Sequence, residues 1–488
     1  MRPKKNRKKA IMTSRLVFTS TLLTSSASAK RRTYLLPSLT FLAMGCLLHI
    51  FAYQSLEPVV AGVIFFMLGA CLLRLPSVGG DFERVGFRLV FAIGWFMAGV
   101  AAVYANYLND PMQNSSDSAW FFELASGKAS NLSLVSIQGL TNGAGAVVIW
   151  RAVYDAFAVI GFEKGRYLGV LVNVTSVAFS CVLAVKITRL VYGNDTSRLN
   201  RLILLFSMCG LFWLFAAIHL RDGSVLLGVT ALSYVWTRYL VKPEIQNIVF
   251  LVAATVFAFA FFGLFRAEFL FVPLAMLVAG LAAILMFGKF RGNRKVIIYI
   301  LALTGVMITG VLFSNFQEEL FTSLIKGYQS YGEAADTSSD SLGLTLIVNQ
   351  PILLRLILGS SYLYIFPIPF WSGLELGTAY HLFKSFNALF FYALIPLIAL
   401  SILIIARDKA VRTPSLMFQL FIMIGFTLAI AGTSLEGRHL GAFLVPLLVL
   451  VLLPDLTLKK YRNTYKIFLV TFLFMMTMLH LTWLVMKV

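Results

Sequence analysis

The sequence predicts an all-α integral membrane protein with about thirteen transmembrane helices. Hydrophobic residues make up 59% of the 488 positions, charged residues only 13%, and the mean hydropathy is +0.84. A water-soluble domain of this size does not tolerate such a composition. A bilayer core of about 30 Å is spanned by roughly 20 apolar residues in a helix, and an open sheet cannot cross it. The chain is therefore expected to cross the membrane repeatedly as helices.

Thirteen apolar runs are long enough to span. Two long connections, 107–166 and 314–386, separate groups of these runs and form the predicted outer loops. Each loop carries an amphipathic stretch, 147–160 and 341–366, that is expected to lie in the interface rather than to cross. The predicted domains are a basic cytoplasmic tail (1–33) and one polytopic transmembrane domain (34–488). The runs are 34–53, 58–73, 89–106, 167–185, 202–219, 223–240, 247–265, 268–288, 296–313, 387–406, 415–432, 439–454 and 467–486.

The positive charges predict the orientation. The net charge is +20, and with the N-terminus inside, most of the 41 Lys and Arg residues fall in the tail and the inner loops. This is the distribution of the positive-inside rule, so the basic excess does not indicate nucleic acid. We expect a multi-pass protein of the inner (plasma) membrane with a cytoplasmic N-terminus and an extracytoplasmic active face.

Three tight outer turns hold charges next to apolar runs: 219–223 (HLRDG), 265–269 (FRAEF) and 436–439 (EGRH). Local ion pairs or interfacial snorkelling would each explain one such turn. Three turns on one face favour convergence on a single anion site, where an arginine binds phosphate bidentately and a neighbouring carboxylate orients it. The predicted binding residues are Arg221, oriented by Asp222, together with Arg266, Glu268, Arg438 and His439.

The first outer loop supplies the candidate base. Asp117 stands where a short amphipathic helix is expected to begin, so it is either a helix cap or a catalytic carboxylate. A carboxylate beside the membrane and flanked by aromatic residues could remove the proton from a sugar hydroxyl. Two other acids, Asp110 and Glu123, lie seven and six residues away.

These features resemble the GT-C superfamily of lipid-linked membrane glycosyltransferases and, more closely, bacterial polysaccharide polymerase-like membrane proteins. The resemblance spreads over 89–455 and includes GRHLGAFLVP at 437–446 and the proline-rich, aromatic FPIPFW at 366–371. It implies that Asp117 deprotonates the acceptor and that the outer arginines hold the phosphate of a polyprenyl-linked sugar donor.

The resemblance also sets the expected partners. The acceptor would be a glycan or a lipid-linked sugar, within membrane lipids and without nucleic acid. Many GT-C enzymes carry adjacent acids or Asp-x-Asp in the first loop, which this sequence lacks, so no metal or other cofactor is expected.

Motifs that are absent also narrow the function. The sequence has no P-loop, HExxH or GxSxG motif, which leaves ATP-driven transport and soluble-type hydrolysis without support. A secondary transporter or a flippase of lipid-linked oligosaccharides is the main alternative, although no repeated halves are evident. A non-catalytic scaffold is the third possibility.

Overall fold

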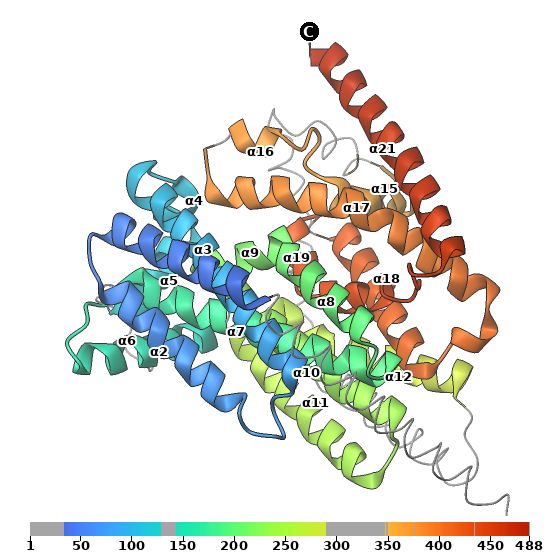
Figure 1. Cartoon of the computed structure of the whole chain (residues 1–488), viewed down its shortest axis with the longest axis horizontal. Coiled ribbons are helices and arrows are strands. Elements are labelled where there is room, and N and C mark those ends of the chain that lie inside the picture. Colours follow the sequence, from blue (N-terminus) through green and yellow to red (C-terminus); the bar gives the residue numbers. More distant parts are fainter. Residues whose placement is uncertain are drawn as a thin grey trace, which may run out of the picture.

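The described part of the chain is a bundle of helices without strands (Figure 1). The computed structural model describes residues 34–127, 143–288, 347, 350–375, 377–433 and 435–487. A helix at Tyr34–Tyr53 comes first. It is followed by α2 (Glu57–Leu72), α3 (Asp81–Tyr107), α4 (Pro111–Asn114), α5 (Asp117–Ser126), α6 (Ala144–Val159), α7 (Arg166–Tyr192), α8 (Thr196–Met208), α9 (Gly210–Ala217), α10 (Asp222–Val241), α11 (Ile245–Phe265), η2 (Ala267–Leu270), α12 (Phe271–Phe287), α15 (Ile352–Ile365), α16 (Ser372–Glu375), α17 (Ala379–Arg407), η3 (Lys409–Val411), α18 (Pro414–Gly432), α19 (Gly437–Gly441), α20 (Leu444–Leu450) and α21 (Lys459–Lys487).

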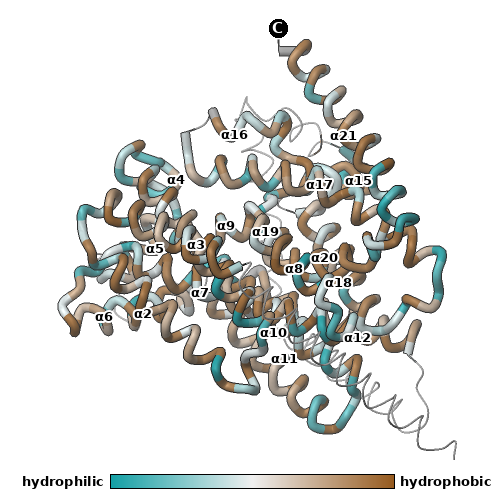
Figure 2. The backbone as a smooth tube through the Cα atoms, viewed as in Figure 1, coloured by the Kyte–Doolittle hydropathy of each residue, from teal (hydrophilic) through white to brown (hydrophobic). Residues whose placement is uncertain are grey.

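Eight described helices are long and apolar enough to cross a membrane, or nine if the bent pair α8–α9 is one span. Three shorter apolar helices, α2, α12 and α15, correspond to two further predicted spans and to the amphipathic stretch of the second outer loop. The apolar residues run along the helices, and many hydrophilic residues lie in the connections (Figure 2). The chain is thus a multi-pass membrane protein by composition and helix length. The predicted span 296–313 and the tail 1–33 lie outside the described residues.

Helix α7 is the centre of the bundle. It packs mainly against α3 and α10, and 78% of the residues in its most apolar 18-residue stretch are buried. Small residues of α3 allow its close packing on α7: a Cβ on Gly86 would lie 3.1 Å from the sulfur of Cys181, and one on Gly94 would lie 3.4 Å from Cγ1 of Val174. Such small-residue contacts are typical where lipid provides no hydrophobic drive for helix association.

Arginines that the prediction places in inner loops contact a predicted inner-loop residue or the end of a predicted span at one end of the bundle. Arg189 forms a 2.6 Å ion pair with the buried Glu83, and Arg198 donates to the carbonyl of Leu452 at 3.1 Å. Arg201 donates to the carbonyl of Pro454 at 3.1 Å. These contacts agree with the grouping that the positive-inside rule predicts, while the side of the membrane on which they lie stays a prediction.

Two predicted spans differ from single straight helices. The run 439–454 forms the short helices α19 and α20. The run 202–219 bends by 58° at Cys209. Asn387 of α17 accounts for the bend, because its side-chain oxygen accepts from the backbone N–H of Leu211 at 3.3 Å. A polar side chain from a neighbouring helix can thus satisfy a backbone group freed by a break in a transmembrane helix.

Candidate functional site

The predicted first outer loop is fixed to α17 by Asp110. This carboxylate is fully buried; it caps α4 by accepting from the N–H of Met112 at 2.9 Å and accepts from the N–H of Ala379 at 3.0 Å. Ala379 is the first residue of α17, so the contact joins segments 269 residues apart. Asp110 is therefore a positioning residue that sets α4 and α5 against the start of α17.

A small cavity lies between these elements. It has a volume of about 150 Å³ and is lined by residues that include Asp117, Tyr380 and Arg438. Asp117 is exposed at the start of α5, whose cap is supplied by Ser116, so its carboxylate is not the helix cap. The predicted base and one predicted phosphate-binding arginine thus share one cavity, although they are more than 300 residues apart in the sequence.

The turn before α10 forms another wall through Ile218 and Leu220. The amide of Asn173, buried on α7, donates to the carbonyl of Ile218 at 2.9 Å and to that of Leu220 at 2.7 Å. Between them, His219 is fully buried and bonds the hydroxyl of Tyr154 at 2.7 Å. The side chain of Asn173 therefore satisfies two backbone carbonyls of this turn and fixes its conformation. The turn then places Arg221 and Asp222 at a defined position.

Asp222 pairs with Arg266, which corrects the expectation that it orients Arg221. A carboxylate oxygen of Asp222 lies 2.8 Å from a guanidinium nitrogen of Arg266, and both side chains are less than 10% exposed. A second guanidinium nitrogen of Arg266 donates to Nε2 of His439 at 2.5 Å. Three predicted residues from three outer turns thus form one hydrogen-bonded group, which we call the Arg266 triad.

A second ion-pair group is bonded to Tyr380, which lines the cavity. Glu436 accepts from Lys384 at 2.8 Å and from the hydroxyl of Tyr380 at 2.7 Å. Burial alone would raise the pKa of Glu436, but the cations of Lys384 and Arg438 outweigh burial and hold that pKa well below its ordinary value. Glu436 is consequently an anion under ordinary conditions and balances part of the positive charge around the cavity.

The remaining predicted residues lie as follows. The guanidinium of Arg221 stands 5.5 Å from the ring centroid of Phe121 on α5, so this arginine packs against the helix that carries Asp117. The side chain of Glu268 lies outside the described residues.

No family model, curated protein or solved structure matches the chain. An exposed carboxylate and a guanidinium line one small cavity, which suits proton removal next to a developing negative charge. Among the described residues, no group of three His, Cys, Asp or Glu side chains is placed to hold a metal ion.

Sequence reasoning did not assign a role to four residues of this region. Tyr380 and Lys384 lie one helical turn apart at the start of a long apolar run. A cation at such a position indicates an anionic partner on a neighbouring segment. Asp110 precedes a proline, as an N-cap residue often does. Asn173 sits within an apolar run, where an amide implies a partner on a neighbouring segment.

His439 predicts a pH dependence of stability. Arg266 can only donate, so Nε2 of His439 must be unprotonated in the folded protein. As the pH drops, His439 therefore binds a proton in the unfolded chain before it does so in the folded protein, and the free energy of unfolding decreases below about pH 6.5. In detergent, the thermal unfolding midpoint of His439→Gln should fall less between pH 7 and pH 5 than that of the wild-type protein, because glutamine keeps an acceptor and does not titrate. Equal losses in both proteins would contradict the neutral histidine.

Proposed function

We propose that the chain is a membrane glycosyltransferase or polysaccharide polymerase that uses a polyprenyl-(di)phosphate-linked sugar at the outer face in cell-surface glycan assembly. The observation that supports this most directly is the cavity shared by Asp117 and Arg438. The Arg266 triad adjoins Arg438 through His439 and brings a second arginine to the same region. A carboxylate near a nucleophile and cations near a leaving phosphate are the two requirements of this reaction.

In the proposed reaction, Asp117 accepts the proton of an acceptor hydroxyl while the oxygen of that hydroxyl attacks the anomeric carbon of the donor. The new glycosidic C–O bond forms as the bond from that carbon to the phosphate oxygen breaks. The departing polyprenyl phosphate or diphosphate takes the electron pair, and Arg438, with Arg221 and Arg266 nearby, stabilises the added charge. A volume of 150 Å³ corresponds to about five water molecules, so the cavity suits the reacting groups rather than an entire oligosaccharide.

Arg438 provides the first test. In vesicles with a polyprenyl-diphosphate sugar as probe, Arg438→Ala should lower the release of polyprenyl diphosphate by about 10²- to 10³-fold, as loss of a charge-stabilising donor does. Arg438→Lys should be intermediate, because lysine keeps the charge but cannot bind phosphate bidentately. Arg151→Ala on α6 is the matched control and should retain activity. Equal activity of all three variants would argue against phosphate binding by Arg438.

A flippase or secondary transporter is the second candidate, and the break in α8–α9 favours it. Discontinuous helices are a recurrent feature of transporter binding sites, and this break lies one short helix from the turn that lines the cavity. Cells that lack the chain distinguish the two functions. Loss of a transferase leaves the lipid-linked sugar in the outer leaflet, whereas loss of a flippase leaves it in the inner leaflet.

A further inference from the structure

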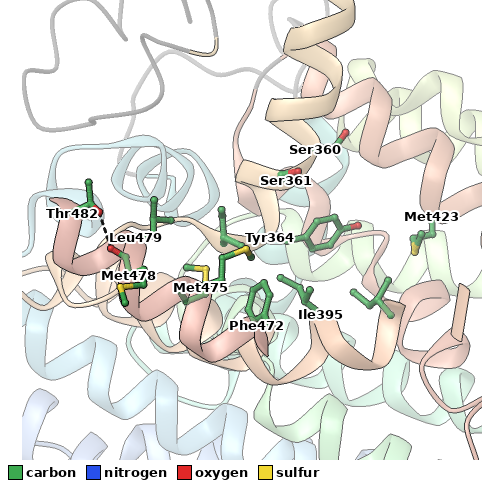
Figure 3. A pocket seen from close by; sticks show the side chains of 13 residues that line it. Ser360, Ser361, Tyr364, Ile395, Met423, Phe472, Met475, Met478, Leu479 and Thr482 are labelled. Atoms are coloured by element: carbon green, nitrogen blue, oxygen red, sulfur yellow. Dashed lines mark hydrogen bonds between the residues drawn. The ribbon is translucent and has the colours of Figure 1, made fainter. Parts of the chain in front are cut away.

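A second, much larger cavity lies away from the charged residues. It has a volume of about 690 Å³ and is bounded by α15, α17, α18 and α21. Figure 3 shows Tyr364, Ile395, Phe472 and Met475 around this space, with Met423 on a further helix. The volume corresponds to about 23 water molecules, far beyond the small voids of an ordinary packed interior.

The walls of this cavity offer hydrocarbon contacts and few polar ones. Four methionines line it, and methionine side chains adapt to irregular apolar partners. Three of the four lining hydroxyls are already engaged: Thr482 donates to the carbonyl of Met478, Ser361 to that of Ile357, and Tyr364 bonds Thr427. The fourth, that of Ser360, is buried and has no hydrogen-bond partner in the described structure, so it is the one free polar group of the lining. Water placed here would lack the two to four polar partners that a buried water needs.

The cavity reaches the membrane-facing surface along α21. The lining residues Met475 and Met478 are 55% and 48% exposed, and the same helix exposes Val470 and Phe474 beside them. Only 11% of the residues in the most apolar 18-residue stretch of α21 are buried, the lowest share among the candidate spans of the described structure. The main neighbour of α21 in the described structure is α17. Figure 1 shows the end of α21 extending beyond the bundle. Because α21 is a candidate span, the medium at this opening is lipid hydrocarbon.

We propose that the cavity is a binding site for an acyl chain of a bilayer phospholipid, and that the bound chain fastens α21 to α15 and α18. Bilayer phospholipids surround the opening at high local concentration, so mass action favours them over a scarce carrier lipid. The ring of Trp371 packs 5.1 Å from that of His480, next to the lining residue Leu479. Tryptophan prefers the headgroup level, which places the phospholipid headgroup at this end of the cavity. The inference stands independently of the proposed glycosyl transfer.

The test compares two tryptophan substitutions on α21. Leu479→Trp fills part of the cavity, whereas Val470→Trp places the same side chain on the lipid-facing surface of the same helix, outside the lining. The full chain is purified in mild detergent from phosphatidylethanolamine and phosphatidylglycerol vesicles, and native mass spectrometry counts the retained phospholipids. The wild-type protein and Val470→Trp should retain at least one phospholipid that Leu479→Trp loses.

Hydrogen exchange of 467–485 provides a second readout that separates lipid loss from misfolding. Added phospholipid should slow exchange of this segment in the wild-type protein and in Val470→Trp, and have at least several-fold less effect in Leu479→Trp, while exchange in α7 stays equal in all three. Equal phospholipid retention by the wild-type protein and Leu479→Trp would overturn the proposal. Retention of a polyprenyl phosphate in place of a phospholipid, in protein purified directly from cell membranes, would overturn it as well.

Discussion

Asp117→Asn is expected to abolish most glycosyl transfer while leaving the folded protein intact. The substitution removes the group that we propose accepts the hydroxyl proton, and general-base catalysis typically contributes about 10²- to 10⁴-fold. Asp117 is exposed and begins α5, whose cap comes from Ser116, so the isosteric amide should cost little stability. The rate of transfer from a polyprenyl-diphosphate sugar to its acceptor, together with the thermal unfolding midpoint, measures both expectations.

Glu123→Gln is the matched control for this prediction. Glu123 lies on the same short helix and is also exposed, but it does not line the cavity. Its neutralisation changes the charge of α5 by the same amount and should leave the rate within a few-fold of the wild-type value. If Glu123→Gln and Asp117→Asn reduce the rate equally, the effect is one of general charge on α5, and Asp117 is not the base.

Helix positions follow from the sequence because the bilayer enforces them. Apolar runs of about 20 residues must become helices that satisfy their own backbone groups, and the predicted runs 223–240 and 415–432 agree closely with α10 and α18. The bend at Cys209 was not predictable in the same way. It depends on the amide of Asn387, which approaches from a helix that lies 176 residues further along the chain than its partner Leu211. Local hydrophobicity contains no information on that contact.

The site shows the same division between local and long-range information. Charges at tight turns between spans predicted Arg438 and the members of the Arg266 triad, because membrane-edge charges are costly and gather around polar cavities. The expected helix start in the first long loop predicted Asp117, and the fold places Asp117 and Arg438 in the lining of one cavity. Sequence proximity then suggested the wrong partner for Asp222, since Arg221 is its neighbour but Arg266 is its ion-pair partner. The network of Glu436 with Tyr380 and Lys384 likewise depends on how α17 packs beside the turn after α18, which no single segment specifies.

The ion pair of Asp222 with Arg266 gives the second large expected effect. Either Asp222→Leu or Arg266→Met alone removes one partner of a pair whose side chains are 6% and 8% exposed. Breaking a buried pair in this way typically costs about 3 to 5 kcal/mol, because the other charge stays in a medium that solvates it poorly. The free energy of unfolding, measured for each single variant in mixed detergent micelles, should fall by this amount.

The double variant Asp222→Leu/Arg266→Met separates the structural role of the pair from its role in phosphate binding. Replacing both charges by apolar groups of similar size removes the uncompensated charge, so most of the lost stability should return. Transfer activity should stay at least about 10²-fold below the wild-type rate, because the guanidinium that we propose stabilises the leaving phosphate is still absent. If activity returns together with stability, Arg266 is a structural residue of the outer turns. The proposed anion site would then rest on Arg221 and Arg438 alone.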